Sequence, residues 1–355
     1  MKRTTLTTAA TVVLLAGMTA VPALATSRIN TEQAARPFDG SDPSTGAWSS
    51  HCDYSGQTDF TDPIKARGGS SMHAHVFFGP STNITPIEKP KDLRAAAANI
   101  CNSATYTLPG RPPTQVPVQD NSAYWVPELL NTNVVKPTQP HGYKEIKPAY
   151  ALVYYRNELV DPTTIEAFPQ NLSIVGGNSA ATGHQGTTII QWSCVAGQNY
   201  TTPQDTIPAS CDDQRVNGVN VSPFYLRMVV QFPNCIIPQT TEDPPGLNEP
   251  TAQTYSSGPT GSWQTCPPGY TPIPTIQVGA RWDLTKTDII PTGATYDLSG
   301  LYLSSDLMIP SAQRVAGETA HADFMSGFTT TDIQNLVQYC VNAQVNCGYV
   351  AGGGV

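Results

Sequence analysis

Two short motifs have a spacing that would place two reactive side chains on the same face of a β-strand. His73 and His75 are two of only six histidines, and they lie one residue apart in the β-prone run 71–78. Residues i and i+2 of a strand point to the same face, so this run offers both imidazoles to one side of a sheet. His321 and Asp323 have the same spacing near the other end of the chain. A fold that brings the motifs together would build one site from these four side chains.

Three imidazole nitrogens and a carboxylate suit zinc, copper, iron or manganese. We therefore treat His73, His75 and His321 as candidate ligands of a divalent metal, and these three with Asp323 as candidate catalytic residues. Two alternatives stay open. In one, the side chains form a polar, metal-free cluster that faces a substrate; in the other, they are structural and hydrogen-bond to the backbone or to carboxylates.

General acid–base work on a glycan needs two carboxylates about 5 to 9.5 Å apart around the scissile bond. The candidate carboxylates are Asp62, Glu128, Glu318 and Asp323. Histidine is an alternative proton carrier, because its pKa lies near neutrality.

Aromatic side chains suggest how a sugar would be held. Tyr124, Trp125 and Trp263 are candidate substrate contacts, because sugar rings stack on aromatic faces. Trp192 stands two residues before Cys194 and is expected in the core.

The chain lacks the motifs of several other enzyme classes. There is no Gly-x-Ser-x-Gly nucleophile elbow, and Gly176-Gly177 lacks the lysine of a phosphate-binding loop. A copper brace with an amino-terminal histidine is disfavoured, because the expected mature chain starts near Thr26 and the first histidine is His51.

Residues 1–25 have the pattern of a secretory signal peptide. Lys2 and Arg3 precede an apolar run, and a small-x-small cleavage pattern ends at Ala25. No other run has the roughly 20 apolar residues that cross a bilayer. We therefore expect a secreted, extracellular protein without stable membrane insertion.

All eight cysteines lie beyond this segment, and disulfides are expected in an oxidising compartment. Sequence proximity favours the pairs Cys52–Cys101, Cys194–Cys211, Cys235–Cys266 and Cys340–Cys347, although other pairings are possible.

The composition is polar but weakly charged. Charged residues are 13% of the chain and the formal net charge is −8, with no basic cluster. Nucleic acid is therefore disfavoured as a partner, since phosphate binding requires patches of Lys and Arg. A polysaccharide or cell-wall glycan fits such a surface better.

Short β-prone runs separated by Pro, Gly and Asn predict a mainly β fold, a β-sandwich or jelly-roll-like single domain. We expect a flexible segment over 26–48, the domain over 49–348, a loop over 238–268 and a flexible tail over 349–355. Short helices are expected near 91–98 and 331–340, the second capped by Thr330 or Thr331. The expected strands are 72–78, 122–125, 149–156, 172–175, 188–194, 225–232, 275–282 and 298–303.

Spaced motifs also occur in the order seen in one family: Trp48 with Cys52, Asp62-Pro63-Ile64, the run 70–75 with Gly79, the run 122–127, Phe168-Pro169, the run 174–178, Trp192-Ser193-Cys194, the run 232–235, Cys266-Pro267 and the run 321–324. The chain resembles the secreted domain-of-unknown-function family numbered nineteen-ninety-six, of fungal and bacterial extracellular proteins. Family members usually carry a central Asp-His-x-Ser-His stretch, but this chain has no histidine between His184 and His321. If the family site uses those histidines, this protein is a divergent or inactive member.

The sequence thus favours a secreted, carbohydrate-active protein with a His/Asp polar cleft. The alternative is a non-catalytic extracellular module that binds polysaccharide or cell wall, and a third possibility is a surface protein whose histidines are a fold signature. The distance between the two histidine motifs is the observation that separates these hypotheses.

Overall fold

The computed structural model describes residues 46–66, 70–80, 93–94, 101–102, 104–109, 113–158, 160–196, 199–212, 224–239, 249–258 and 263–347. The expected signal peptide and the tail over 349–355 lie outside these residues. So does most of the expected helix near 91–98, of which Leu93 and Arg94 are described and helical.

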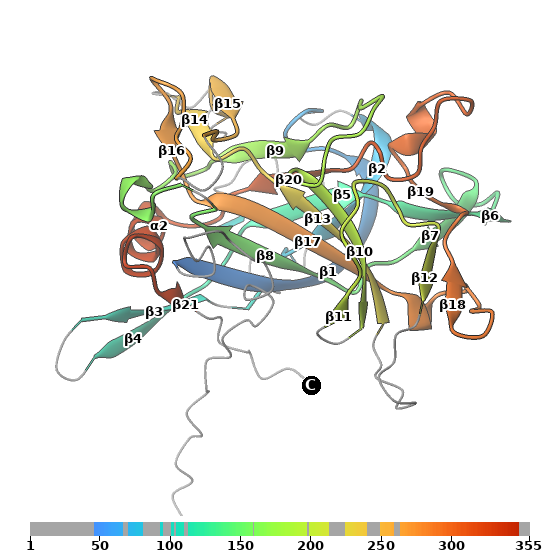
Figure 1. Cartoon of the computed structure of the whole chain (residues 1–355), viewed down its shortest axis with the longest axis horizontal. Coiled ribbons are helices and arrows are strands. Elements are labelled where there is room, and N and C mark those ends of the chain that lie inside the picture. The colour runs from blue at the N-terminus through green and yellow to red at the C-terminus, as the bar shows by residue number, and fades with distance from the viewer. Residues whose placement is uncertain are drawn as a thin grey trace, which may run out of the picture.

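The described chain is mainly β and forms a sandwich of two antiparallel sheets (Figure 1). One sheet contains, in order, β11 (Asn199–Tyr200), β10 (Ile190–Ala196), β13 (Phe224–Gln231), β17 (Thr275–Asp283), β8 (Tyr150–Arg156) and β1 (Ala47–Thr61). The other continues from β1 through β2 (Ser70–Phe78), β5 (Ala123–Pro127) and β20 (His321–Met325) to β9 (Ser173–Gly177). The first is called the front sheet and the second the back sheet.

Strand β1 belongs to both sheets. Residues 47–53 pair with β8, and residues 54–61 pair with β2, with register shifts between Tyr54 and Thr58 and between Asp59 and Thr61. The parallel strand β21 (Asn346–Cys347) joins the first half of β1 as well. We expected a flexible segment up to residue 48, but β1 begins at Ala47 and Trp48 is completely buried.

The inner faces of the two sheets meet in one large apolar core. The ring of Trp48 stacks on Tyr155 with centroids 4.6 Å apart, and Tyr155 in turn contacts Phe324 of the back sheet. As the sequence predicts, Trp192 lies in this core, where it stacks on Trp282. Since side chains alternate along a strand, the residues between these core positions point to the outer faces of the sandwich.

Short elements surround the sandwich. The strands are β3 (Ala104–Leu108), β4 (Thr114–Val118), β6 (Leu129–Val135), β7 (Tyr143–Ile146), β12 (Ser210–Asp212), β14 (Cys235–Ile237), β15 (Ala252–Thr254), β16 (Thr271–Pro272), β18 (Thr295–Asp297) and β19 (Leu301–Leu303). The short helices are η2 (Pro162–Thr164), η4 (Leu284–Lys286), η5 (Asp306–Met308), α2 (Thr330–Leu336) and the π-helix η6 (Val337–Asn342).

The sequence predictions agree with most of this architecture. All four preferred disulfides form: Cys52–Cys101, Cys194–Cys211, Cys235–Cys266 and Cys340–Cys347. The helix near 331–340 is present, but its N-cap is Thr329, whose hydroxyl accepts from the N–H of Asp332. The expected loop over 238–268 contains β15, which pairs with β14. No helix among the described residues is long and apolar enough to cross a membrane.

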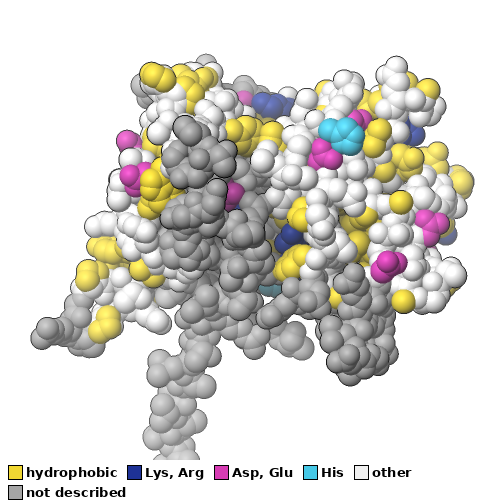
Figure 2. Space-filling model, in the orientation of Figure 1, with side chains coloured by type: hydrophobic (Ala, Val, Ile, Leu, Met, Phe, Trp, Pro, Cys, Tyr) yellow, Lys and Arg dark blue, Asp and Glu magenta, His cyan; other side chains and the backbone are white. Residues whose placement is uncertain are grey.

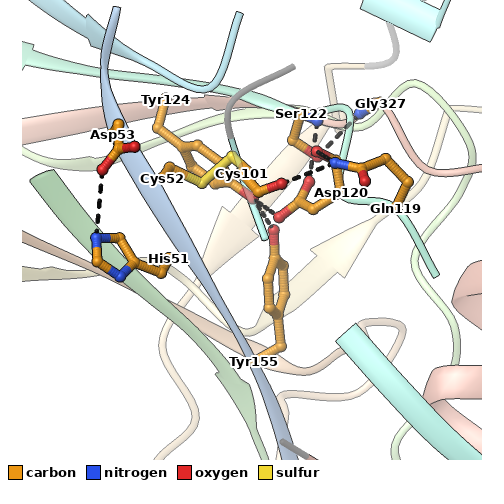
Figure 3. The surroundings of a disulfide bond; sticks show 10 residues. All are labelled: His51, Cys52, Asp53, Cys101, Gln119, Asp120, Ser122, Tyr124, Tyr155 and Gly327. Atoms are coloured by element: carbon orange, nitrogen blue, oxygen red, sulfur yellow. Dashed lines mark hydrogen bonds and ion pairs between the residues drawn. A yellow bond between two sulfur atoms is a disulfide. The ribbon is translucent and has the colours of Figure 1, made fainter. Parts of the chain in front are cut away.

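A buried polar network crosses the core beside the Cys52–Cys101 disulfide (Figure 3). The hydroxyl of Tyr124 in the back sheet donates to Asp120 Oδ2 at 2.6 Å and also contacts the hydroxyl of Tyr155 in the front sheet. Asp120 Oδ1 accepts from the N–H of Ser122 at 2.9 Å. The network therefore ties the two sheets together at a fully desolvated point, where a lost partner is costly.

The disulfide that closes the longer loop should contribute more stability. Replacing Cys52 and Cys101 by Ala should lower the free energy of unfolding by about 4 kcal/mol, and replacing Cys340 and Cys347 by about 2 kcal/mol. The pairs are separated by 49 and 7 residues, and a longer loop loses more entropy in the unfolded chain when it is closed. Denaturant titration of both double variants measures the two losses. A larger loss for the short loop would contradict this account.

Asp120 should make stability depend on pH. Burial raises the pKa of Asp120 above its ordinary value of 3.8, although hydrogen bonds from Ser50, Tyr124 and Ser122 oppose this. The folded state then holds the proton more tightly than the unfolded state, so stability falls as pH rises from the ordinary value towards the raised one. Relative to Asp120→Asn, wild type should be more stable at about pH 4.5 than at about pH 7. Unfolding curves of both proteins at each pH test this, and a constant difference would refute it.

Candidate functional site

Three histidines from the two distant motifs meet on the outer face of the back sheet. The Nε2 atom of His321 lies 3.2 Å from Nε2 of His73 and 3.4 Å from Nε2 of His75. One ligand nitrogen from each ring lies within 4.8 Å of the others. These residues are called the three-histidine site. The structure thus brings together the motifs that are about 250 residues apart in sequence.

The strand register explains this convergence. His75 of β2 pairs with Pro127 of β5, and Asp323 of β20 pairs with Trp125. Continuing the second register by two residues places His321 opposite Pro127. The three positions therefore form one row across three strands and share a face. The compact ring of Pro127 lies in the middle of the row, so the imidazoles on either side can reach over it towards each other.

Strand β9 also approaches β20 closely beside His321. Gly177 pairs with His321 and has a φ of 75°. A Cβ atom at this position would lie 2.5 Å from the carbonyl oxygen of Ala320. Only glycine accommodates both the positive φ and the close backbone contact at this edge of the site.

Backbone carbonyls orient two of the rings. His75 Nδ1 lies 3.0 Å from the oxygen of Thr61, and His321 Nδ1 lies 2.9 Å from the oxygen of Thr319. A carbonyl oxygen only accepts, so each Nδ1 carries the proton and donates it. In the neutral rings, both Nε2 atoms then present lone pairs to the centre of the cluster. A cation placed there would satisfy both.

The electrostatics keep the histidines neutral. Burial, with repulsion from neighbouring rings, lowers the pKa of His321 to about 3 and of His73 to about 4, and the pKa of His75 is also well below its usual value. Neutral imidazole is the form that binds metals. A tetrahedral metal with N ligands at about 2.0–2.1 Å requires donor atoms roughly 3.3 Å apart. The two Nε2–Nε2 distances fit this spacing.

A buried carboxylate holds the loop that carries Thr319. Asp306 Oδ1 accepts from the Thr319 hydroxyl at 2.6 Å, and Oδ2 accepts from the N–H groups of Leu303 and Gly317. Asp306 therefore positions the carbonyl that orients His321, as outer-shell groups do in metal sites. Sequence reasoning missed this residue, because nothing in its local pattern marks it.

Asp323 lies on the same face as the three histidines. Its Oδ2 atom is buried and has no hydrogen-bond partner among the described residues, and the same holds for Nε1 of its register partner Trp125. Burial raises the pKa of Asp323 well above its usual value, and the nearby Asp62 adds to this effect. An unpartnered acceptor and an unpartnered donor thus come from paired positions on the face that carries the three histidines.

The turn after β1 lies above this face. Asp62 Oδ1 accepts from the N–H groups of Ile64 and Lys65, and Ile64 packs on Phe77 and Trp125 of the sheet. Asp62 is therefore a turn-forming residue that also lies near Asp323. The side of the site at His73, which is 9% exposed, is the most open; His321 is 3% exposed and His75 is fully buried.

A fourth histidine lies next to the site, and sequence reasoning did not single it out. His141 Nε2 accepts from the N–H of Ala74 at 3.4 Å and lies 3.7 Å from Glu128 Oε2. Burial and the charge of Glu145 raise the pKa of Glu128 to about 8, so its carboxyl is protonated at neutral pH. Burial also lowers the pKa of His141, so the pair is neutral.

The predicted aromatic contacts need correction. Tyr124 and Trp125 are both completely buried, so neither can stack on a sugar at the surface. Tyr124 belongs to the core network, and Trp125 packs under the 62–66 turn. Trp263 is 37% exposed and remains a candidate. Glu318 is buried, and its carbonyl accepts from Gln185.

Comparison with known proteins gives a family for the chain. No curated protein and no solved structure matches it. The family described as Domain of unknown function (DUF1996) matches residues 62–328. This match contains two of the four disulfides, Cys194–Cys211 and Cys235–Cys266. It also includes β2, β5, β9 and β20 with every member of the three-histidine site. The chain therefore belongs to the DUF1996 family.

Proposed function

We propose that this chain is a secreted, metal-dependent, carbohydrate-active protein in which His73, His75 and His321 hold one divalent ion. The observation that carries the proposal is the convergence of three Nε2 atoms, with the Nδ1 atoms of His75 and His321 held by backbone carbonyls. Neutral nitrogen ligands and the tetrahedral spacing make zinc the best-matched metal. The predicted signal peptide and the four disulfides support an extracellular location.

Three neutral ligands would leave the full charge of the ion available to a further ligand. Such an ion would lower the pKa of a bound water to about 7 and polarise a substrate oxygen. Asp323 is two residues from His321 on the same face, where its carboxyl could exchange a proton with a group at the metal. This set of groups supports hydrolysis or elimination on a polysaccharide.

A second candidate is a non-catalytic polysaccharide-binding module whose metal is structural. The burial of His75 and His321 favours it, since structural metal sites are closed to solvent. The two candidates differ in what the metal does. In the enzyme the ion is required for turnover, whereas in the module it stabilises the fold.

Metal binding is the first test. Protein stripped with a chelator and reloaded should bind one Zn²⁺ per chain, and the ion should raise the unfolding temperature, because it binds the folded state. His75→Ala and His321→Ala should each weaken Zn²⁺ binding by at least about 100-fold, since each removes a ligand. Elemental analysis and calorimetric titration measure both effects.

His184→Ala is the matched control for these variants. His184 is exposed and pairs with Asp205 at 2.9 Å, outside the cluster. Its replacement should leave Zn²⁺ binding unchanged. If wild type binds no divalent ion, or if His75→Ala binds as tightly as wild type, the metal proposal fails.

Catalysis is the second test. Metal-loaded wild type should release reducing or unsaturated ends from at least one member of a polysaccharide panel. Asp323→Asn should lower the rate by about 100-fold or more while it keeps the ion, because it removes the proton-exchanging group. Product analysis and metal content are measured on the same samples.

Asp205→Asn serves as the control, since Asp205 lies by the exposed His184. Equal rates for wild type and Asp323→Asn would remove Asp323 from the chemistry. Polysaccharide binding with no product from any substrate would favour the module, and metal removal should then change stability alone.

A further inference from the structure

A second feature of the molecule is a hollow of about 310 Å³ on the outer face of the front sheet. Arg156, Arg227 and Arg281 contribute to its lining, together with Tyr154 and Tyr200. In Figure 2, basic side chains lie inside a hollow near the centre of the view, in the region of β13 and β17 in Figure 1. The feature is called the arginine hollow.

Strand register builds the arginine hollow. Gly279 pairs with Leu152 of β8 on one side and with Val229 of β13 on the other. Because glycine has no side chain, the outer surface of the sheet is recessed at Gly279, in the middle of this row; this is the low point of the hollow. In the next row Arg281 pairs directly with Arg227, so two guanidinium groups border the low point from neighbouring strands.

Aromatic rings hold the arginines in place. The Arg227 guanidinium carbon lies 4.5 Å from the centroid of Tyr200, and that of Arg281 lies 5.5 Å from Tyr150 and 5.7 Å from Tyr225. Arg156 donates to Gln277 Oε1 at 2.6 Å and pairs with Glu158. A stacked guanidinium is restrained in orientation, so it is prepared to meet a planar anion with two parallel hydrogen bonds.

The chemistry of the lining indicates the ligand. Three guanidinium groups line the hollow, and no carboxylate is among its described lining residues, although the whole chain carries a net charge of −8. The other polar groups are the neutral amides of Gln191 and Gln277 and the hydroxyl groups of Thr201 and Thr202. Guanidinium groups match a carboxylate, while amides, hydroxyls and tyrosine faces match sugar hydroxyls and ring faces.

We propose that the arginine hollow binds an acidic saccharide, with the carboxylate of a uronic acid residue held by Arg227 and Arg281. This site is separate from the three-histidine site, because the two sheets turn their inner faces towards the shared core and their outer faces away from each other. A chain that binds here is therefore anchored on the face opposite the histidines. The inference stands whether or not the three-histidine site is catalytic.

Binding of a galacturonic acid trimer to the full chain tests the proposal. Calorimetric titration should detect binding to wild type, and the affinity should fall as salt is raised. Arg227→Gln should weaken binding at least about tenfold, because it removes a positive charge and one of the two guanidinium groups that hold the carboxylate. Tyr200→Leu, which removes the ring below Arg227, should weaken binding by a smaller factor.

Three controls make the outcome decisive. Lys286→Gln removes a charge from an 81% exposed side chain outside the hollow and should bind as wild type does. The methyl ester of the trimer, which lacks the carboxylate charge, should not bind. Absence of trimer binding to wild type, or equal binding by wild type, Arg227→Gln and Tyr200→Leu, would overturn the proposal. Equal or tighter binding of a triglutamate peptide would overturn the assignment to a saccharide.

Discussion

The passage of one long strand from the front sheet to the back sheet is the constraint on which the structure depends. The first half of β1 pairs with β8 and the second half with β2, so one backbone fixes the position of both sheets. Trp48 near its start is buried in the core, and Cys52 anchors its middle through a disulfide. Its last residue, Thr61, accepts from His75. The strand thus links the core to the face that carries the three histidines.

The three-histidine site follows from this arrangement through backbone groups. Two rings are oriented by carbonyl oxygens, which cannot donate and therefore decide which ring nitrogen keeps its proton. The remaining nitrogens face one another in a dry environment where imidazole stays neutral. Neutral rings with converging lone pairs cannot all hydrogen-bond to one another. A metal ion between the rings would accept these lone pairs, and this is the basis of the proposed metal site.

The alternation of side chains in a sandwich separates two kinds of surface. Inner positions such as Tyr155 and Phe324 form the core, and the alternate positions of each strand point to the outer faces. On the back sheet these outer positions carry histidines and Asp323 beneath a turn. On the front sheet they carry arginines around Gly279. The histidine cluster and the arginine hollow therefore lie on opposite outer faces of the sandwich.

Local sequence was sufficient for several features. The β-branched and aromatic runs predicted a mainly β fold, and cysteines near in sequence predicted all four disulfides. The strand that contains His73 and His75 was predicted because it is a β-prone run bounded by turn residues. In contrast, β1 was not predicted, since its Ser, Asp, Gly and Gln residues resemble a loop and its strand pairing comes from neighbours that are distant in sequence.

The sequence by itself determined which side chains share a face: His73 with His75, and His321 with Asp323, because strand geometry is local. Tertiary structure alone decided that the two pairs meet across Pro127, since strand order and register depend on long-range pairing. It also decided that Tyr124 and Trp125 are buried, because burial depends on what packs above a strand. The carbonyls of Thr61 and Thr319, and the three arginines from three strands, become a site only in the folded chain.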